Sequence, residues 1–396
     1  MKKGWEIKKL VDVCFVERGS SPRPIKDYIT DSDNGVNWIK IGDTKEVNKY
    51  IYSTKQKITK KGAEKSRYVK EGDFILSNSM SFGKPYIMKT DGYIHDGWFV
   101  LRLYDFIDAE YFFQLLSSPY VNNQFHNLAS GSVVKNISGD LVKKVVLPIP
   151  PLTEQKRIVS ILDKAFAEIA QAKANAEQNL KNAKELFESY LNGIFEKKGD
   201  DWEEKTLGEV CVKTETVNPK LEPKKEFVYI DVSSVNKETK IIEETTTLLG
   251  KEAPSRARKF VRTNDVIFAT VRPTHQRVAI INNEFNNQVC STGYYVLRTK
   301  EIVHYKIIYY YILTFSFNEE MKKRQKGASY PAVTNKDVES QIISFPKPKA
   351  EQKQIVKKLD QLQAETKKLE LVYQQKLDNL EELKKSILQK AFNGEL

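Results

Sequence analysis

Polar and basic side chains gather in two pairs of loops, each loop following a hydrophobic segment. Residues 79–84 (Ser-Met-Ser-Phe-Gly-Lys) and residues 271–277 (Val-Arg-Pro-Thr-His-Gln-Arg) form the first pair. Residues 131–138 and 327–334 form the second pair and carry Ser, Thr, Lys, Asn and Tyr. Hydroxyl, amide, guanidinium and ammonium groups of this kind bond to base edges and phosphates. These loops therefore predict recognition of a nucleic acid.

A third matched region, rich in Lys and Arg, lies at residues 60–67 and 256–259. For any single residue a solvated loop is the alternative interpretation, whereas the loops taken as groups favour contact with DNA. The predicted DNA-binding residues are Lys60, Lys61, Arg67, Asn78, Ser79, Ser81, Phe82, Lys84, Ser132, Lys135, Asn136, Arg256, Arg258, Thr270, Arg272, Thr274, His275, Arg277, Ser329, Tyr330 and Thr334.

Signals for catalysis are poor. The sequence has no phosphate-cradling G-x-x-x-x-G-K-[ST] loop and no glycine-rich cofactor turn. The nearest match to the Asn-Pro-Pro-Tyr type motif of adenine methyltransferases is residues 118–120 (Ser-Pro-Tyr), which lacks the second proline. The four histidines show no metal-ligand spacing. We therefore predict no catalytic residue, no metal site and no cofactor in this chain.

Almost all of the surplus positive charge lies in residues 1–150 and 201–349. The net charge is +12, and residues 1–150 hold 23 basic and 17 acidic side chains, a surplus of 6. Residues 201–349 hold 24 and 19, a surplus of 5. Residues 151–200 and 350–396 have surpluses of 0 and 1. Two basic regions joined by near-neutral segments suit a protein that holds a polyanion at two places.

The composition also indicates the compartment. No apolar run is long enough for a membrane span, and the first residues lack the apolar core of a signal peptide. The three cysteines have no C-x-x-C spacing, and we expect them to be small buried apolar residues. These features predict a cytoplasmic protein with no membrane contact.

An internal duplication organises the chain. Residues 147–163 (LPIPPLTEQKRIVSILD) and 344–360 (SFPKPKAEQKQIVKKLD) share Pro-x-Pro, Glu-Gln-Lys, Ile-Val and Leu-Asp, 197 positions apart. The Trp-Glu at Trp5 recurs at Trp202, and Cys14 recurs at Cys211, again 197 positions apart. A repeat of this length predicts two tandem halves.

Each half changes character at its Pro-x-Pro. Before it, short runs rich in Ile, Val, Tyr and Phe predict strands, and residues 108–116 and 304–314 predict short helices. After it, apolar residues recur at alternating steps of three and four, which is the pattern of a coiled-coil seam. We expect globular α+β domains at residues 1–152 and 198–349, and long helices at 153–197 and 350–396.

Neither long helix can bury its seam alone, so the two helices are expected to pair. The predicted helix-pairing residues are Ile158, Leu162, Ile169, Leu180, Phe187, Ile355, Leu359, Leu362, Leu369, Leu380 and Ile387.

The order Trp-Glu, variable domain, Pro-x-Pro, Glu-Gln-Lys-x-Ile-Val-x-x-Leu-Asp and long helix, all repeated, resembles the specificity subunit of type I restriction–modification enzymes. The ending Ala391–Leu396 (AFNGEL) resembles the end of that family's chains as well. The resemblance covers the whole chain. One departure is that Lys349-Ala350 replaces Pro151-Leu152-Thr153, so the second copy is one residue shorter.

The resemblance implies a non-enzymatic protein with pseudo-twofold symmetry. Each globular domain would be a target recognition domain that reads one half of a bipartite, asymmetric site on double-stranded DNA. The helices would pack as an antiparallel coiled coil, set the spacer between half-sites and dock two modification (methyltransferase) subunits. Those partners would bind S-adenosylmethionine and methylate adenine, and restriction subunits would join the full complex. The alternative from another class is a coiled-coil scaffold that binds other proteins, its basic surface being incidental; a nuclease or methyltransferase lacks its motifs.

Overall fold

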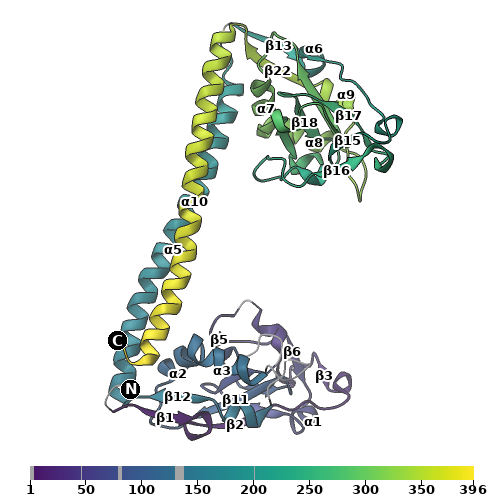
Figure 1. Cartoon of the computed structure of the whole chain (residues 1–396). Helices are drawn as coiled ribbons and strands as arrows, with labels where there is room; N and C mark the ends of the chain where they lie inside the picture. Colours follow the sequence, from purple (N-terminus) through teal and green to yellow (C-terminus); the bar gives the residue numbers. More distant parts are fainter. Residues whose placement is uncertain (1–3, 46, 79–82, 130–137, 200) are drawn as a thin grey trace. The chain divides into compact units, whose positions relative to one another are not determined.

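The computed structural model describes residues 4–45, 47–78, 83–129, 138–199 and 201–396. The chain divides into two compact units (Figure 1). The first unit is residues 1–176 with 375–396, and the second unit is residues 177–374. Within the described residues, no helix has both the length and the apolar composition needed to cross a bilayer.

The main sheet of the first unit has the strand order β2-β11-β8-β9-β5. Its strands are β2 (Cys14–Arg18), β5 (Tyr50–Ile51), β8 (Phe74–Ser77), β9 (Pro85–Met88) and β11 (Trp98–Leu103). Side chains alternate along a strand, so Phe74 and Leu76 join one buried cluster while Ile75 joins another. Both faces of this sheet are therefore covered, which explains why β8 is a continuous apolar run.

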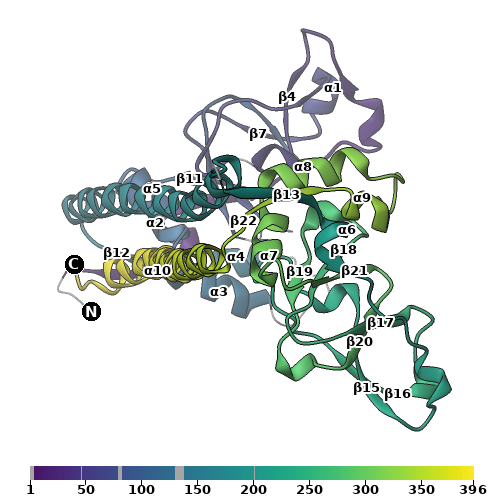
Figure 2. The same cartoon turned by 90° about the horizontal axis from the view of Figure 1, so that it is seen from above.

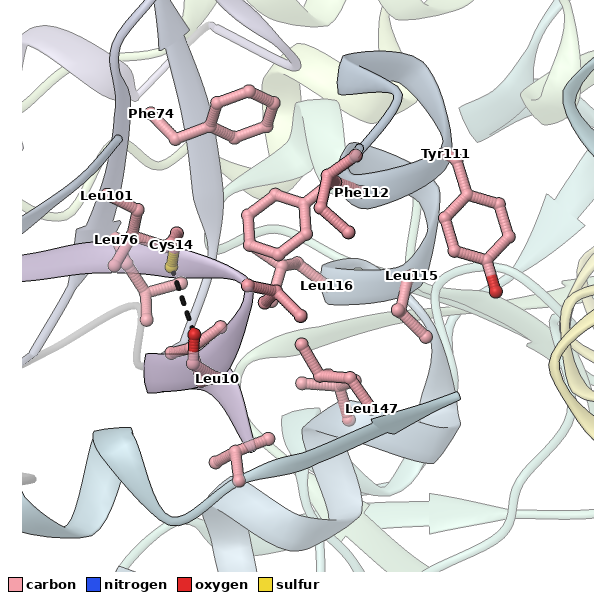
Figure 3. Close-up of a cluster of buried hydrophobic side chains, with 14 of the residues drawn as sticks. Leu10, Cys14, Phe74, Leu76, Leu101, Tyr111, Phe112, Leu115, Leu116 and Leu147 are labelled. Carbon is pink, nitrogen blue, oxygen red and sulfur yellow. Dashed lines mark hydrogen bonds between the residues drawn. The ribbon is translucent and has the colours of Figure 1, made fainter. Parts of the chain in front are cut away.

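Helices cover one face of this sheet. They are α2 (Ala109–Leu116), α3 (Pro119–Ala129) and α4 (Gly139–Lys143). Figure 3 shows Phe112 of α2 facing Phe74, with the ring centroids 5.2 Å apart. In the same cluster the Cys14 thiol donates to the Leu10 carbonyl at 3.4 Å, and burial raises the pKa of this thiol to about 12. The prediction that the cysteines are buried is confirmed for all three.

A second sheet covers the other face, in the order β3-β6-β4-β10-β7. Its strands are β3 (Ile29–Thr30), β4 (Val36–Ile39), β6 (Gln56–Ile58), β7 (Arg67–Val69) and β10 (Gly92–Ile94), and the short helix α1 (Lys60–Ala63) lies between β6 and β7 in the chain. Ile39, Val69 and Ile94 of this sheet pack against Trp98 and Val100 of β11. Strands β4 and β10 pair in parallel, although their neighbours pair antiparallel.

The second unit repeats this arrangement. Its sheets have the orders β14-β21-β18-β19 and β16-β15-β20-β17, and β15 and β20 form the parallel pair. The strands are β14 (Cys211–Val212), β15 (Glu226–Ile230), β16 (Thr246–Leu249), β17 (Ala257–Val261), β18 (Val266–Ala269), β19 (Val278–Ile280), β20 (Gln288–Ser291) and β21 (Tyr294–Thr299). Helices α7 (Tyr305–Leu313) and α8 (Phe315–Arg324) lie on one face of the β14-β21-β18-β19 sheet, the face that points away from β15 and β20 (Figure 2). The predicted pair of α+β domains is confirmed.

The two repeated motifs of each half meet in a short ribbon. Strand β1 (Glu6–Lys9), which follows Trp5, pairs antiparallel with β12 (Val146–Ile149), which holds the start of the first Pro-x-Pro. Strand β13 (Trp202–Thr206) pairs in the same way with β22 (Ile342–Pro346). Both ends of each globular region are thereby tied together next to the start of a long helix.

The long helices are α5 (Leu152–Glu196) and α10 (Lys349–Asn393). In the first unit, Ile158 and Leu162 of α5 share a cluster with Leu388 and Phe392 near the end of α10. In the second unit, the end of α5 packs against the start of α10. The helices are thus antiparallel within each unit and lie side by side in Figure 1.

Most of the predicted seam is buried or half-buried, with one error. Ile158, Leu162 and Leu359 are buried, and Phe187 and Ile355 pack against the second unit's core. Ile169, Leu180, Leu362, Leu380 and Ile387 are half-buried. The prediction for Leu369 is wrong, because its side chain is 41% exposed. Thr366 is buried instead, and its hydroxyl donates to the Leu362 carbonyl at 2.9 Å.

A buried ion pair recurs in the two units. Arg102 donates to Asp73 at 3.2 Å, and Arg298 donates twice to Asp265, at 2.9 and 2.8 Å. Asp73 is 4% exposed and Asp265 is 1% exposed. Each arginine also contacts a glutamate of the strand β2 or of the segment after β14. A carboxylate this deeply buried depends on these partners.

We expect Asp265→Asn to destabilise the second unit more than Asp73→Asn destabilises the first. In Asp265→Asn an amide NH₂ replaces one of the two oxygens that accept from Arg298, and hydrogen bonds to charged groups suggest that this costs about 2 kcal/mol of unfolding free energy. Asp73 accepts one bond from Arg102, so we expect Asp73→Asn to cost about 1 kcal/mol. Native-state hydrogen exchange of β18 and β8 amides measures the two losses separately. Equal losses, or a larger loss in the first unit, would contradict this ranking.

Candidate nucleic-acid interface

The two loops predicted in the second half meet in the structure. Val271 and Ala332 form an antiparallel bridge. The Arg272 N–H donates to the Pro331 carbonyl at 2.7 Å, and the Val333 N–H donates to the Thr270 carbonyl at 2.9 Å. These bonds join two segments about 60 positions apart in the sequence into one surface, a juxtaposition that the sequence did not predict.

Beside these joined loops lies a hollow of about 470 Å³, which we call the second-unit hollow. Its lining is rich in basic side chains and contains no carboxylate. The residues are Val232, Ser233, Lys237, Arg256, Val271, Arg272, His275, Arg277, Tyr330 and Ala332. An adjoining hollow, which shares Lys237 and Arg277, carries Glu238, Glu243 and Glu244, so the basic area is bounded on that side.

The Arg272 side chain is exposed, and its backbone and the Tyr330 ring restrict its position. Its backbone lies in the left-handed region, with φ 50° and ψ 57°, where a residue with a Cβ is strained. The N–H bond to Pro331 holds it there. Its guanidinium carbon lies 5.3 Å from the ring centre of Tyr330, which is 72% exposed. The ring restricts the guanidinium and leaves its donors open to solvent.

The first unit has a hollow where the parallel strands β4 and β10 end, lined by other loops than those of the second-unit hollow. This first-unit hollow has a volume of about 800 Å³. Its lining residues are Ser21, Pro22, Arg23, Pro24, Ile25, Lys26, Trp38, Lys40, His95 and Asp96. It is basic as well, with one carboxylate, and its side chains differ from those of the second-unit hollow. Two basic surfaces with different side chains suit two different ligand sequences.

Asp96 organises this hollow. It accepts from the Ser21 hydroxyl at 2.7 Å and pairs with Arg23 at 3.3 Å. The Ser21 hydrogen bond, together with the nearby Arg23 charge, lowers the pKa of Asp96. Burial lowers the pKa of His95, so its ring is neutral near pH 7. The positive charge of the first-unit hollow therefore comes from Arg23, Lys26 and Lys40.

A family model described as the type I restriction modification DNA specificity domain matches residues 2–181 and again residues 199–381. The chain belongs to this family. The two matches coincide with the two halves, so each hollow lies in its own copy of a DNA specificity domain.

Curated relatives of this DNA specificity chain are specificity subunits. It is 25% identical over 315 residues to the type I restriction enzyme EcoKI specificity subunit of Escherichia coli, covering 75% of this chain and 68% of that one. It is 25% identical over 228 residues to the MjaIX specificity subunit of Methanocaldococcus jannaschii, covering 52% of each. The chain thus spans about half the length of the MjaIX relative.

Solved structures share the fold over the whole chain. One, from work on complex assembly and conformational transition of the type I R-M system, has a TM-score of 0.81 at 21% identity and covers 100% of this chain and 99% of that one. The HsdS subunit from Thermoanaerobacter tengcongensis has a TM-score of 0.64 at 22% identity and covers 100% and 98%.

Several predicted DNA contacts in the second DNA specificity domain have internal roles instead. The Thr270 hydroxyl is buried and donates to the Gly293 carbonyl at 3.0 Å. Thr334 caps α9 (Asn335–Glu339) by accepting from the Asp337 N–H. Arg258 donates to the Asn218 side chain. Arg277 lines the hollow, but it donates to the backbone carbonyls of Ser233 and Val235, so it is an anchor.

The remaining predictions in this domain divide by position. Arg256, Arg272, His275 and Tyr330 come together in the second-unit hollow. Thr274 is half-buried beside them in the chain, and Ser329 is exposed next to Tyr330. These six residues stay predicted DNA contacts, and Lys237 joins them.

In the first DNA specificity domain the loop predictions were less successful. Asn78 is buried and donates to the Asp96 carbonyl at 2.8 Å, and Arg67 pairs with Glu17 at 2.9 Å, so both are structural. Lys60, Lys61 and Lys84 are exposed but do not line the first-unit hollow. Predicted contacts that lie outside the described residues are Ser79, Ser81, Phe82, Ser132, Lys135 and Asn136.

Sequence reasoning missed Arg23, Lys26 and Lys40. The signal was present in residues 18–26 (Arg-Gly-Ser-Ser-Pro-Arg-Pro-Ile-Lys), where basic residues alternate with turn formers after β2. The second half has basic residues here as well, since Lys220 lies 197 positions after Arg23, but neither segment was included among the predicted contacts. Among the described residues, no group of three or more His, Cys, Asp or Glu is placed to hold a metal ion.

Proposed function

We propose that this chain is the DNA-recognition subunit of a type I restriction–modification complex. Residues 1–152 and 198–349 would be target recognition domains, each reading one half of a bipartite, asymmetric site on double-stranded DNA. The observation that supports the proposal is a basic hollow in each of the two DNA specificity domains, with different side chains in each. Similar folds would present the two surfaces alike, and different side chains would select different bases.

The proposed partners supply the chemistry. Two modification subunits would dock on the paired helices, bind S-adenosylmethionine and methylate adenine, and restriction subunits would complete the complex in the cytoplasm. This chain's own contribution is binding and orientation. The match to DNA specificity domains over both halves disfavours the alternative of a protein-binding scaffold whose basic surface is incidental.

Methylome sequencing tests the proposal. A host lacking other methyltransferases would express the full chain together with its partner modification subunits. We expect methylated adenines within one bipartite motif whose two halves differ in sequence, and none when this chain is omitted. A palindromic or uninterrupted motif, or methylation that persists without the chain, would contradict the proposed function.

We expect salt to weaken DNA binding by the complex, and Lys237→Gln to reduce that dependence. Each ammonium group that neutralises a phosphate releases counterions, so its loss should lower the slope of log affinity against log salt by about 1. Lys251→Gln is the matched control, because Lys251 is exposed in the same unit and lies outside the second-unit hollow. Fluorescence anisotropy with a duplex carrying the motif gives both slopes. Equal slopes for the two variants would remove Lys237 from the interface.

A further inference from the structure

The Glu-Gln-Lys of each repeat places a glutamine inside the protein. Gln155 and Gln352 are both fully buried, at 0% exposure, in the first turns of α5 and α10. A primary amide offers two donors and two acceptor lone pairs in one plane, and a buried one needs partners. The contacts of these two amides therefore show what each helix start is bound to.

Gln155 makes three hydrogen bonds, all to backbone groups. Its Oε1 accepts from the Asp108 N–H at 2.8 Å, and its Nε2 donates to the Phe106 carbonyl at 3.1 Å and to the Pro150 carbonyl at 2.9 Å. Asp108 is the N-cap of α2, and Pro150 follows β12. One side chain thus joins the start of α5 to a helix and to the Pro-x-Pro strand of its domain.

Gln352 repeats this pattern in the second unit. Its Oε1 accepts from the His304 N–H at 2.7 Å, and its Nε2 donates to the Ile302 carbonyl at 3.0 Å and the Pro346 carbonyl at 2.8 Å. His304 is the N-cap of α7, and Pro346 ends β22. Gln155 and Gln352 therefore make the same three hydrogen bonds to corresponding backbone positions, although the side chains around them differ.

The hydrogen bonds of the two glutamines fix an orientation that apolar packing leaves free. Ile158, Leu162 and their counterparts hold the helices against the domains, but hydrophobic contacts tolerate small rotations. Three bonds from one planar amide fix the direction of the first turn. A helix of 45 residues is about 68 Å long, so a tilt of about 5° at its start displaces its far end by about 6 Å. That displacement exceeds the ~3.4 Å rise of one DNA base pair.

We propose that Gln155 and Gln352 are positioning residues that fix the direction in which each long helix leaves its recognition domain. They thereby set the length of DNA spacer that the two domains accept between their half-sites. This inference rests on the proposed function, and it concerns the spacer alone. The amides touch no base and select no sequence.

A spacer library tests the inference. Plasmids carry the two half-sites of the wild-type motif separated by a range of spacer lengths, and the full chain methylates them with its partner subunits. We expect wild type to use one spacer length and Gln352→Leu to methylate the neighbouring lengths as well, by at least tenfold over wild type, at unchanged half-site sequences. Gln352→Glu, which keeps the acceptor and loses both donors, should broaden the spacer too if the leucine variant fails to fold.

Thr314→Val is the control for lost stability. Thr314 is buried in the same unit and its hydroxyl donates to the Tyr311 carbonyl at 2.7 Å, away from the helix start. This variant should lower the melting temperature and keep one spacer length. Folded Gln352 variants that keep the single wild-type spacer, or that alter the half-site bases, would overturn the inference. A wild-type complex without a bipartite motif would instead refute the proposed function.

Discussion

Replacing residues 1–152 by the same region of another DNA specificity chain should exchange one half of the methylated motif and leave the other half unchanged. The first-unit hollow is lined entirely by residues 21–96, and the second-unit hollow by residues 232–332. No residue is shared between them. Each mismatched base pair costs about 1–3 kcal/mol, so a half-site that is wrong at several positions should lose methylation almost completely.

The boundary at residue 152 makes this replacement feasible. The bonds that Gln155 makes across it go to backbone groups, which any domain of the same fold supplies. The side-chain packing across it is mainly apolar, and includes Ile158 and Leu162 with Leu147 and Ile149, and Phe392 with Tyr111, whose ring centroids lie 5.5 Å apart. Volume-conserving differences at such positions are tolerated.

Methylome sequencing of cells expressing the chimera reads the outcome directly. The reciprocal replacement of residues 198–349 is the matched control and should exchange the other half. Spacer length should stay constant in both chimeras, because both retain their glutamines and helices. A chimera that changes both half-sites would show that the domains do not read DNA independently.

The duplicated fold was predictable because its signals are local and occur twice. In β8, Phe74, Ile75 and Leu76 form an apolar run, and the side chains on both faces of the strand are buried. The equivalent run recurs in β18. The pairing of β1 with β12 was not foreseen, since a Trp-Glu motif and a Pro-x-Pro motif carry no mark of being neighbours. Long-range pairing of this kind leaves no trace in a single sequence.

The candidate site was predicted less well, for a physical reason. The residue type shows which groups a side chain can bond to. The fold determines whether that side chain is already hydrogen-bonded to another group inside the protein. Asn78 and Thr270 have suitable groups, but the Asp96 and Gly293 carbonyls accept their donors.

Arg272→Ala should relax recognition of the second half-site at a guanine position, with a loss of up to ~3 kcal/mol, or roughly 100-fold, in discrimination. The guanidinium is exposed, stacked on Tyr330 and carried by a strained backbone, so its fork of donors is available to a base edge. Arg277→Ala should act differently. Its guanidinium holds the Ser233–Val235 segment, so we expect weaker binding to all sequences and unchanged base preference.

Arg272→Lys separates base reading from phosphate binding at this position. Lysine keeps the charge but has no planar fork for the guanine O6 and N7, so discrimination should fall while the salt dependence of binding stays at the wild-type slope. Competition binding against duplexes with each base substituted in the second half-site measures discrimination, and anisotropy at several salt concentrations measures the slope. If Arg272→Lys keeps full discrimination while Arg272→Ala loses affinity for every duplex alike, Arg272 binds a phosphate, and the reading of the second half-site falls to His275, Arg256 and the other side chains of the second-unit hollow.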